Sequence, residues 1–73
     1  MGSNHSTRPP LTLREKEVLS LLAEGLTYGS IARKLGISPH TVDTHLRRLR
    51  RKTGAANRTQ LAILGHLWGY VDM

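Results

Sequence analysis

The sequence contains no cysteine, so the chain forms neither a disulfide nor a metal site built on thiolates. No apolar run approaches the roughly 18 residues that a membrane-spanning helix needs, and no signal-peptide core is present. The sequence also lacks the arrangements that enzymes use, namely a nucleophile beside a base, paired carboxylates or a glycine-rich phosphate loop. We therefore expect a cytoplasmic protein that is neither an enzyme nor membrane-bound and that needs no cofactor.

Acidic residues are also scarce: five stand against eleven Lys and Arg, which gives a formal net charge of +6. The positive charge is concentrated in residues 38–53, which hold five of the cations and one acid, Asp43. A basic patch confined to one element indicates a polyanionic partner such as nucleic acid. The alternative is a solvated charged helix face. We rank it second because these cations lie in the second helix of the pattern described next.

The segment from Thr27 to Lys52 has the pattern of a short helix, a tight turn and a longer basic helix. Gly36 can adopt the positive φ that a sharp helix end requires. Ser38 is a good N-cap, and Pro39 is tolerated at the first helical position, where no N–H is needed. A helix–turn–helix with a basic second helix predicts a protein that inserts this helix into the major groove of DNA.

The other helices are predicted from capping and apolar spacing. We expect the first helix to start at Thr12, which forms a T-x-x-E capping box with Glu15, and to end at Gly25, with its acids facing outward. The second should span residues 28–35, the third residues 39–53, and the fourth about residues 57–68. We expect one compact all-α domain, a winged-helix-like DNA/RNA-binding three-helix core plus a C-terminal helix, in residues 8–73. Residues 1–7 read as an expression leader or a disordered segment.

Five stretches of the chain together form a motif pattern that can be compared with known families: LTLREKEVLSLLAEGLT (11–27), IARKLGIS (31–38), TVDTH (41–45), KTG (52–54) and NRTQL (57–61). With them the chain resembles the LuxR/FixJ (GerE-type) C-terminal helix–turn–helix domain of bacterial transcriptional regulators. The resemblance implies an effector domain that binds double-stranded DNA as a homodimer, with its third helix in the major groove. It also implies an upstream receiver or ligand-binding domain, and RNA polymerase as a further partner. The chain departs from the family at Asp43, where Lys or Arg is usual.

Two other interpretations compete with this one. A sigma-factor region-4-like promoter-binding domain carries a similar I-A-x-x-L-G-I-S stretch and a basic last helix. The apolar tail that follows Gly54 argues against it, because a sigma domain would not need an apolar fourth helix there. A pure protein-interaction module is the third class, favoured by the fourth helix alone.

Base contacts are expected near the start of the basic helix and phosphate contacts further along it. The side chains expected at bases are His40, Asp43, Thr44 and Arg47. Arg47 is the best candidate, because a guanidinium can bond both O6 and N7 of guanine. A phosphate contact is the alternative role for Arg47, ranked close behind. Asp43 either accepts from cytosine or, four residues before Arg47, holds that arginine in one orientation. We favour the second role.

Phosphate contacts are expected from basic side chains and from helix starts, where free N–H groups suit an anion. The set comprises Thr27, Lys34, Thr41, Arg48, Arg51, Lys52, Asn57, Arg58 and Thr59. For the threonines and the asparagine, capping is the alternative role. His40, Asp43 and His45 do not share one helix face, so no metal site is expected. His45 should be half-buried and hydrogen-bonded within the domain.

The predicted fourth helix carries an apolar arc wider than packing against three short helices needs. We interpret the arc as a dimer interface formed by Leu61, Ile63, Leu64, Leu67 and Trp68. Leu61, Leu64 and Trp68 form one stripe and Ile63 and Leu67 lie beside it, and either can face the partner. The alternative is a wholly buried helix, which is less common in so small a domain.

Overall fold

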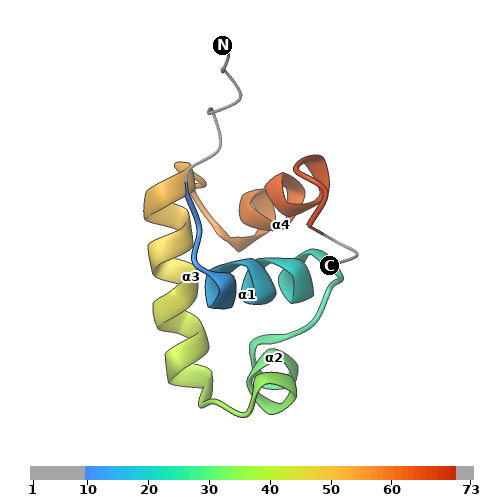
Figure 1. Ribbon diagram of the computed structural model, residues 1–73, viewed down its shortest axis with the longest axis vertical. Helices are drawn as coiled ribbons and strands as arrows, with labels where there is room; N and C mark the ends of the chain where they lie inside the picture. The colour runs from blue at the N-terminus through green and yellow to red at the C-terminus, as the bar shows by residue number, and fades with distance from the viewer. Residues whose placement is uncertain (1–9, 71–73) are drawn as a thin grey trace.

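The computed structural model describes residues 10–70, which form four helices joined by short connections (Figure 1). They are α1 (Leu13–Ala23), α2 (Tyr28–Leu35), α3 (Pro39–Thr53) and α4 (Arg58–Leu67). The expected all-α fold is confirmed, and the helix ends agree with the expected ones to within two residues. The leader expected at residues 1–7 lies outside the described residues. No helix in the described part of the chain is long and apolar enough to cross a membrane.

Each helix begins at a side chain that accepts a hydrogen bond from the backbone of its first turn. At α1, Thr12 Oγ1 accepts from the Glu15 N–H at 3.1 Å and Glu15 Oε1 accepts from the Thr12 N–H at 2.9 Å, which completes the expected capping box. At α3, Ser38 Oγ accepts from the Thr41 N–H at 3.0 Å. The turn before α3 uses Gly36 at φ 70°, a conformation that glycine adopts without steric cost. These local bonds fix where the basic helix starts.

The core lies where α1 and α3 meet. Each of these two helices packs against all three others, whereas α2 and α4 pack mainly against this pair. In Figure 1, α1 crosses the centre of the molecule between α2 and α4, and α3 runs along one side. α3 contributes Val42, Leu46 and Leu49, each 0 % exposed, to a core that includes Leu19 and Leu61. Burial of these three side chains fixes the rotation of α3 and leaves its opposite face in water.

Gly65 marks a close approach of α4 to α1. The residue is buried, and a Cβ placed on it would lie 3.0 Å from Ala23 Cβ and 3.2 Å from Leu19 Cδ1. Carbon atoms prefer a separation of about 3.5–4.0 Å, so a methyl group here would push the two helices apart. Gly29 in α2 is different, because a Cβ there would meet nothing closer than Arg33 Nη1 at 4.0 Å.

We predict that Gly65→Ala destabilises the domain by about 1–2 kcal/mol, because the cost of overpacking exceeds the gain in helix propensity. Gly29→Ala should instead stabilise it by up to about 1 kcal/mol, since only the propensity gain applies there. Thermal and urea unfolding followed by circular dichroism measure both changes. A Gly65→Ala variant as stable as the unaltered chain would show that α1 and α4 are less closely packed than described.

Candidate nucleic-acid interface

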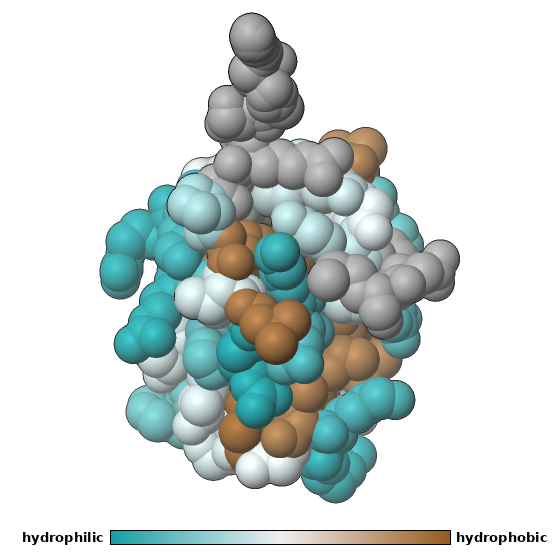
Figure 2. All heavy atoms as spheres, viewed as in Figure 1, coloured by the Kyte–Doolittle hydropathy of each residue, from teal (hydrophilic) through white to brown (hydrophobic). Residues whose placement is uncertain are grey.

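The face of α3 opposite the core is polar and cationic. Its exposed side chains are His40, Arg47, Arg48 and Arg51, with Asp43 and Thr44 half-buried among them. Hydrophilic side chains line the edge of the molecule along which α3 runs (Figure 2). The structure therefore brings onto one helix face all four residues expected at bases and two of those expected at phosphates.

Asp43 and Arg47 form the ion pair that their spacing predicts. Asp43 Oδ2 lies 3.0 Å from Arg47 Nε. The Arg47 side chain is 64 % exposed and that of Asp43 is 31 % exposed, so the guanidinium is the more accessible of the two groups. A helix pair of this kind contributes only about 0.3–0.5 kcal/mol to stability. The pair engages the guanidinium of Arg47 at its Nε atom.

The threonines of α3 use their hydroxyl groups within the helix. Thr44 Oγ1 donates to the His40 carbonyl at 3.1 Å, and Thr41 Oγ1 lies 2.9 Å from Ser38 Oγ at the N-cap. The hydroxyl proton of Thr44 is thus occupied, and its methyl group and an acceptor lone pair remain for a ligand. Thr41 supports the start of α3, where free backbone N–H groups attract an anion.

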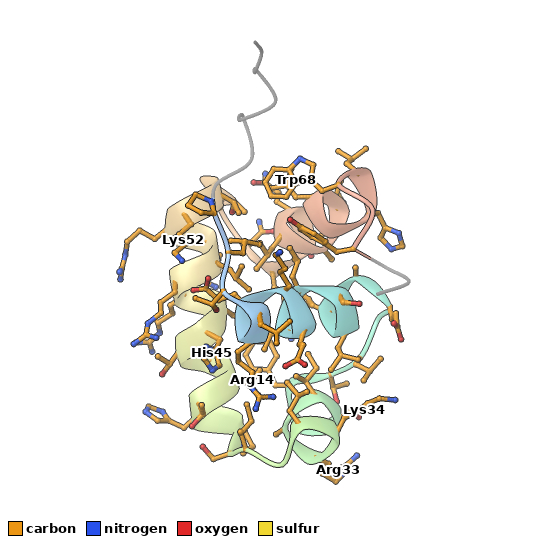
Figure 3. All side chains as sticks on the ribbon, viewed as in Figure 1. Arg14, Arg33, Lys34, His45, Lys52 and Trp68 are labelled. Atoms are coloured by element: carbon orange, nitrogen blue, oxygen red, sulfur yellow. The ribbon has the colours of Figure 1, made fainter. Side chains whose placement is uncertain are left out.

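Lys52 is turned away from this face toward α1, so the structure gives no support to its expected phosphate contact, which stays a prediction. Lys52 Nζ donates to Glu15 Oε1 at 2.8 Å and to the Pro10 carbonyl at 3.4 Å, joining the end of α3 to the start of α1 (Figure 3). The outward position expected for Glu15 is wrong, because its side chain is only 4 % exposed. A buried carboxylate is costly without a partner, and Lys52 supplies one.

The surroundings of Glu15 lower the pKa of its carboxyl group. Burial alone raises this pKa, but the Lys52 ammonium and the hydrogen bonds from Thr12 outweigh burial and hold the pKa below its ordinary value. The carboxylate is therefore ionised at neutral pH, which keeps its ion pair with Lys52 intact.

Lys34 lies away from the exposed face of α3. It extends from α2 on the side away from α3 (Figure 3) and lines a surface depression of about 430 Å³ together with Glu17 and Glu24 of α1. The structure therefore gives no support to the expected phosphate contact of Lys34, which stays a prediction.

The first residues of α2 and α4 come together at the surface. Thr27, Arg58 and Thr59 line one depression of about 240 Å³. The Arg58 guanidinium carbon lies 5.3 Å from the ring centroid of Tyr28, a cation–π contact that orients the arginine. Asn57 caps α4 beside them. The contact of Tyr28 with Arg58 could not be predicted from the sequence, because no local pattern shows that these two helix starts are neighbours.

The apolar arc of α4 divides into a buried and an exposed stripe. Leu61 is 0 % exposed in the core, so its expected place in a partner contact is wrong. Ile63 and Leu67 are 52 % and 70 % exposed, and Leu64 and Trp68 are half-buried. Ile63 and Leu64 also line a depression of about 330 Å³ beside the connection from α3 to α4. The stripe left for a partner is therefore centred on Ile63 and Leu67.

His45 is half-buried, as expected, but the hydrogen bond expected for it is not formed at Nδ1. This nitrogen is buried without a partner. Within residues 10–70, no three His, Asp or Glu side chains are grouped so that they could hold a metal ion.

A protein-family model matches almost the whole of this arrangement. The model for bacterial regulatory proteins of the luxR family matches residues 9–64, which include α1, α2, α3 and most of α4. The chain belongs to the LuxR family of bacterial regulatory proteins. Its helix–turn–helix is therefore the DNA-binding domain of a transcription regulator, and the LuxR family is one of regulators rather than of enzymes. This membership favours the interpretation as a LuxR-type transcription regulator over that as a sigma-factor domain.

Relatives of the LuxR-family domain are longer proteins. The chain is 45 % identical over 53 residues to the transcriptional regulatory protein UhpA of Escherichia coli (strain K12), covering 73 % of this chain and 27 % of UhpA. It is 40 % identical over 65 residues to the transcriptional regulatory protein LiaR of Bacillus subtilis (strain 168), covering 89 % of this chain and 31 % of LiaR. The chain thus spans less than a third of the length of these regulators.

Solved structures of Vibrio cholerae VqmA contain a similar domain. The VqmA dimer in the absence of target DNA superposes with a TM-score of 0.84 at 38 % identity, over 99 % of this chain and 31 % of VqmA. The VqmA–ligand–DNA complex superposes with a TM-score of 0.81 at 37 % identity, over 100 % of this chain and 32 % of VqmA. The four-helix arrangement of this LuxR-family domain therefore occurs in a protein that has been solved with DNA.

The buried ion pair gives a test of acid stability. We predict that Glu15→Gln lowers the free energy of unfolding at pH 7 by about 1–3 kcal/mol, the value of hydrogen bonds to charged groups. Because the folded-state pKa of Glu15 is lowered, its contribution is fully present above the unfolded-state pKa of about 4.3 and is lost as the pH falls through the folded-state value. Urea unfolding at a series of pH values should therefore show the two proteins converging in acid.

Glu17→Gln is the matched control. Glu17 Oε1 lies 3.3 Å from Arg14 Nη1, but both side chains are 43 % exposed, so this substitution should cost less than about 1 kcal/mol. Equal losses in the two variants, or a difference for Glu15→Gln that persists in strong acid, would contradict the assigned role of Glu15.

Proposed function

We propose that this domain reads double-stranded DNA by inserting α3 into the major groove. One observation carries the proposal: α3 buries Val42, Leu46 and Leu49 completely and exposes cationic side chains on its opposite face. A helix fixed in this rotation suits a groove about 12 Å wide. Its positively charged arginines are then attracted to the negatively charged phosphates that border the groove.

The proposed contacts divide along the helix. Side chains from the start of α3 to just past its middle face the bases: His40, Asp43, Thr44 and Arg47. Side chains further along it and at the helix N-termini face phosphates: Arg48, Arg51, Thr41, Thr27, Asn57, Arg58 and Thr59. Arg58 is supported by its contact with Tyr28, which directs it to the depression that also contains Thr27 and Thr59.

Pairing of two copies through α4 is the second part of the proposal. Ile63 and Leu67 are large apolar side chains exposed on one helix, and together with half-buried Leu64 and Trp68 they form a stripe that a second copy can cover. Two copies related by a two-fold axis would present their α3 helices to half-sites about 34–36 Å apart, one turn of DNA.

The complete regulator is proposed to carry a further domain. Because the chain spans less than a third of UhpA and LiaR, those proteins contain other segments, and a receiver or ligand-binding domain upstream of this one would supply the control. The regulator would act in the bacterial cytoplasm, where it meets both chromosomal DNA and RNA polymerase.

Arg51→Ala tests the orientation on DNA. We predict that it lowers affinity for duplexes of all sequences and reduces the slope of log K against log salt by about 0.9, the contribution of one phosphate contact. Lys34→Ala removes the same charge from α2 and should leave the slope nearly unchanged. Fluorescence anisotropy with a labelled duplex over a salt series measures both. A slope that stays unchanged in Arg51→Ala would mean that the DNA does not lie on α3.

Leu67→Glu tests the pairing surface. We predict that the variant binds an isolated half-site as the parent does but loses the added affinity of a two-fold symmetric site, because a carboxylate at the centre of the stripe opposes burial. Leu13→Glu, at a side chain of α1 that is 71 % exposed, is the control and should retain cooperative binding. Mobility-shift titrations on half-sites and full sites report the result, and undiminished cooperativity in Leu67→Glu would exclude α4 as the interface.

A further inference from the structure

The ion pair on the exposed face of α3 occupies a defined part of the Arg47 guanidinium. Asp43 Oδ2 lies 3.0 Å from Nε, so the carboxylate stands on the Nε side of the group. The two terminal nitrogens, Nη1 and Nη2, lie at the far end of the side chain, which is 64 % exposed. Asp43 therefore leaves the terminal edge of Arg47 as the edge that a ligand meets.

The terminal edge of a guanidinium presents two parallel N–H donors. It is matched by a group with two acceptors side by side. In the major groove, guanine presents two adjacent acceptors, O6 and N7, whereas adenine presents an acceptor beside a donor and cytosine presents a donor. Thymine presents a single acceptor, O4, so guanine is the only base that offers an acceptor to each of the two donors of an arginine fixed in this orientation.

Asp43 has little other role to play at this position. An exposed pair with i, i+4 spacing adds only about 0.3–0.5 kcal/mol to stability. Its carboxylate is also the only acid on a face that is otherwise neutral or cationic, and a negative charge near phosphates opposes the binding of any DNA. Asp43 therefore weakens the sequence-independent attraction to DNA and adds little to the stability of the fold. Its presence is explained if it improves discrimination between DNA sequences.

We infer that Asp43 is a positioning residue that holds the terminal edge of Arg47 toward guanine in the major groove, so that the pair exchanges affinity for specificity. The inference rests on the proposed function, because it requires α3 to lie in the groove. It separates the role of Asp43 from direct readout of cytosine. It also makes a prediction that direct readout does not make. Removing the carboxylate should raise affinity for random-sequence DNA and lower discrimination at one guanine.

The test begins with duplexes selected from a random-sequence pool by the unaltered chain. Each guanine of the selected site is then replaced in turn by 7-deazaguanine, which has a C–H in place of the N7 acceptor. At the guanine read by Arg47, the unaltered chain should lose about fivefold or more in affinity, within the range of a bidentate arginine–guanine contact. Arg47→Ala should lose this sensitivity at that guanine alone and keep it at others.

Asp43→Asn then tests the positioning role, because the amide keeps the shape and removes the charge. The 7-deazaguanine penalty at the Arg47 guanine should shrink by about threefold or more, while affinity for random-sequence duplex rises. Asp43→Glu, which restores the carboxylate, should recover part of the penalty. Glu17→Gln removes one negative charge from an exposed pair on α1 and should leave the penalty unchanged. Thermal unfolding should be the same for all these variants to within a few degrees.

The possible results distinguish a failure of the inference about Asp43 from a failure of the proposed DNA-binding function. A chain that enriches no sequence from the pool would refute sequence-specific DNA binding, and the inference with it. A chain that enriches a motif, but whose Arg47-dependent guanine tolerates 7-deazaguanine equally in the parent and in Asp43→Asn, would refute the inference alone. Loss of preference at a cytosine in Asp43→Asn, with the guanine penalty intact, would refute it in favour of direct readout.

Discussion

The buried stripe of α3 is the contact on which the rest of this domain depends. The exposed face of the helix carries Arg47, Arg48 and Arg51, and like charges at helical spacing cost about 0.2–0.5 kcal/mol for each pair. Full burial of one leucine contributes about 1.5–3 kcal/mol, so Leu46 and Leu49 alone outweigh that repulsion. A 15-residue helix of this composition would be marginal in isolation. It is stable here because α1, α2 and α4 together cover one of its faces, and the same contacts leave the cationic face in water.

The ion pair between Glu15 and Lys52 adds a polar contact to the apolar packing of α3 against α1. Moving the Glu15 carboxylate out of water costs free energy, and its attraction to the partly exposed Lys52 offsets the cost only when the geometry is good. The geometry here is good: the two groups are 2.8 Å apart, and the Thr12 N–H donates to the same carboxylate. The ion pair joins one point near the end of α3 to one near the start of α1, and so adds a directional contact to the apolar packing between the two helices.

Much of the fold and one helix face of the candidate interface could be predicted from the sequence. Thr12, Ser38 and Asn57 each accept a hydrogen bond from the first turn of the helix that follows, so the predicted starts hold in the structure. The pairing of Asp43 with Arg47 was predictable for the same reason, because both partners lie on one helix. Contacts of this kind span three or four residues, and the geometry of a helical turn places the partners without help from the rest of the chain.

Contacts between helices were decided only by the tertiary structure. Glu15 is buried and Lys52 is drawn to it, although both are ordinary surface residues by type. Leu61 faces the core while Leu67 faces solvent, although both are leucines on one amphipathic helix. The sequence by itself determined which residues are helical and which share a face, because a turn of 3.6 residues fixes those relations. Only the packing of α1, α3 and α4 determined which face is covered, because the rotation of one helix against another depends on side chains far apart in the chain.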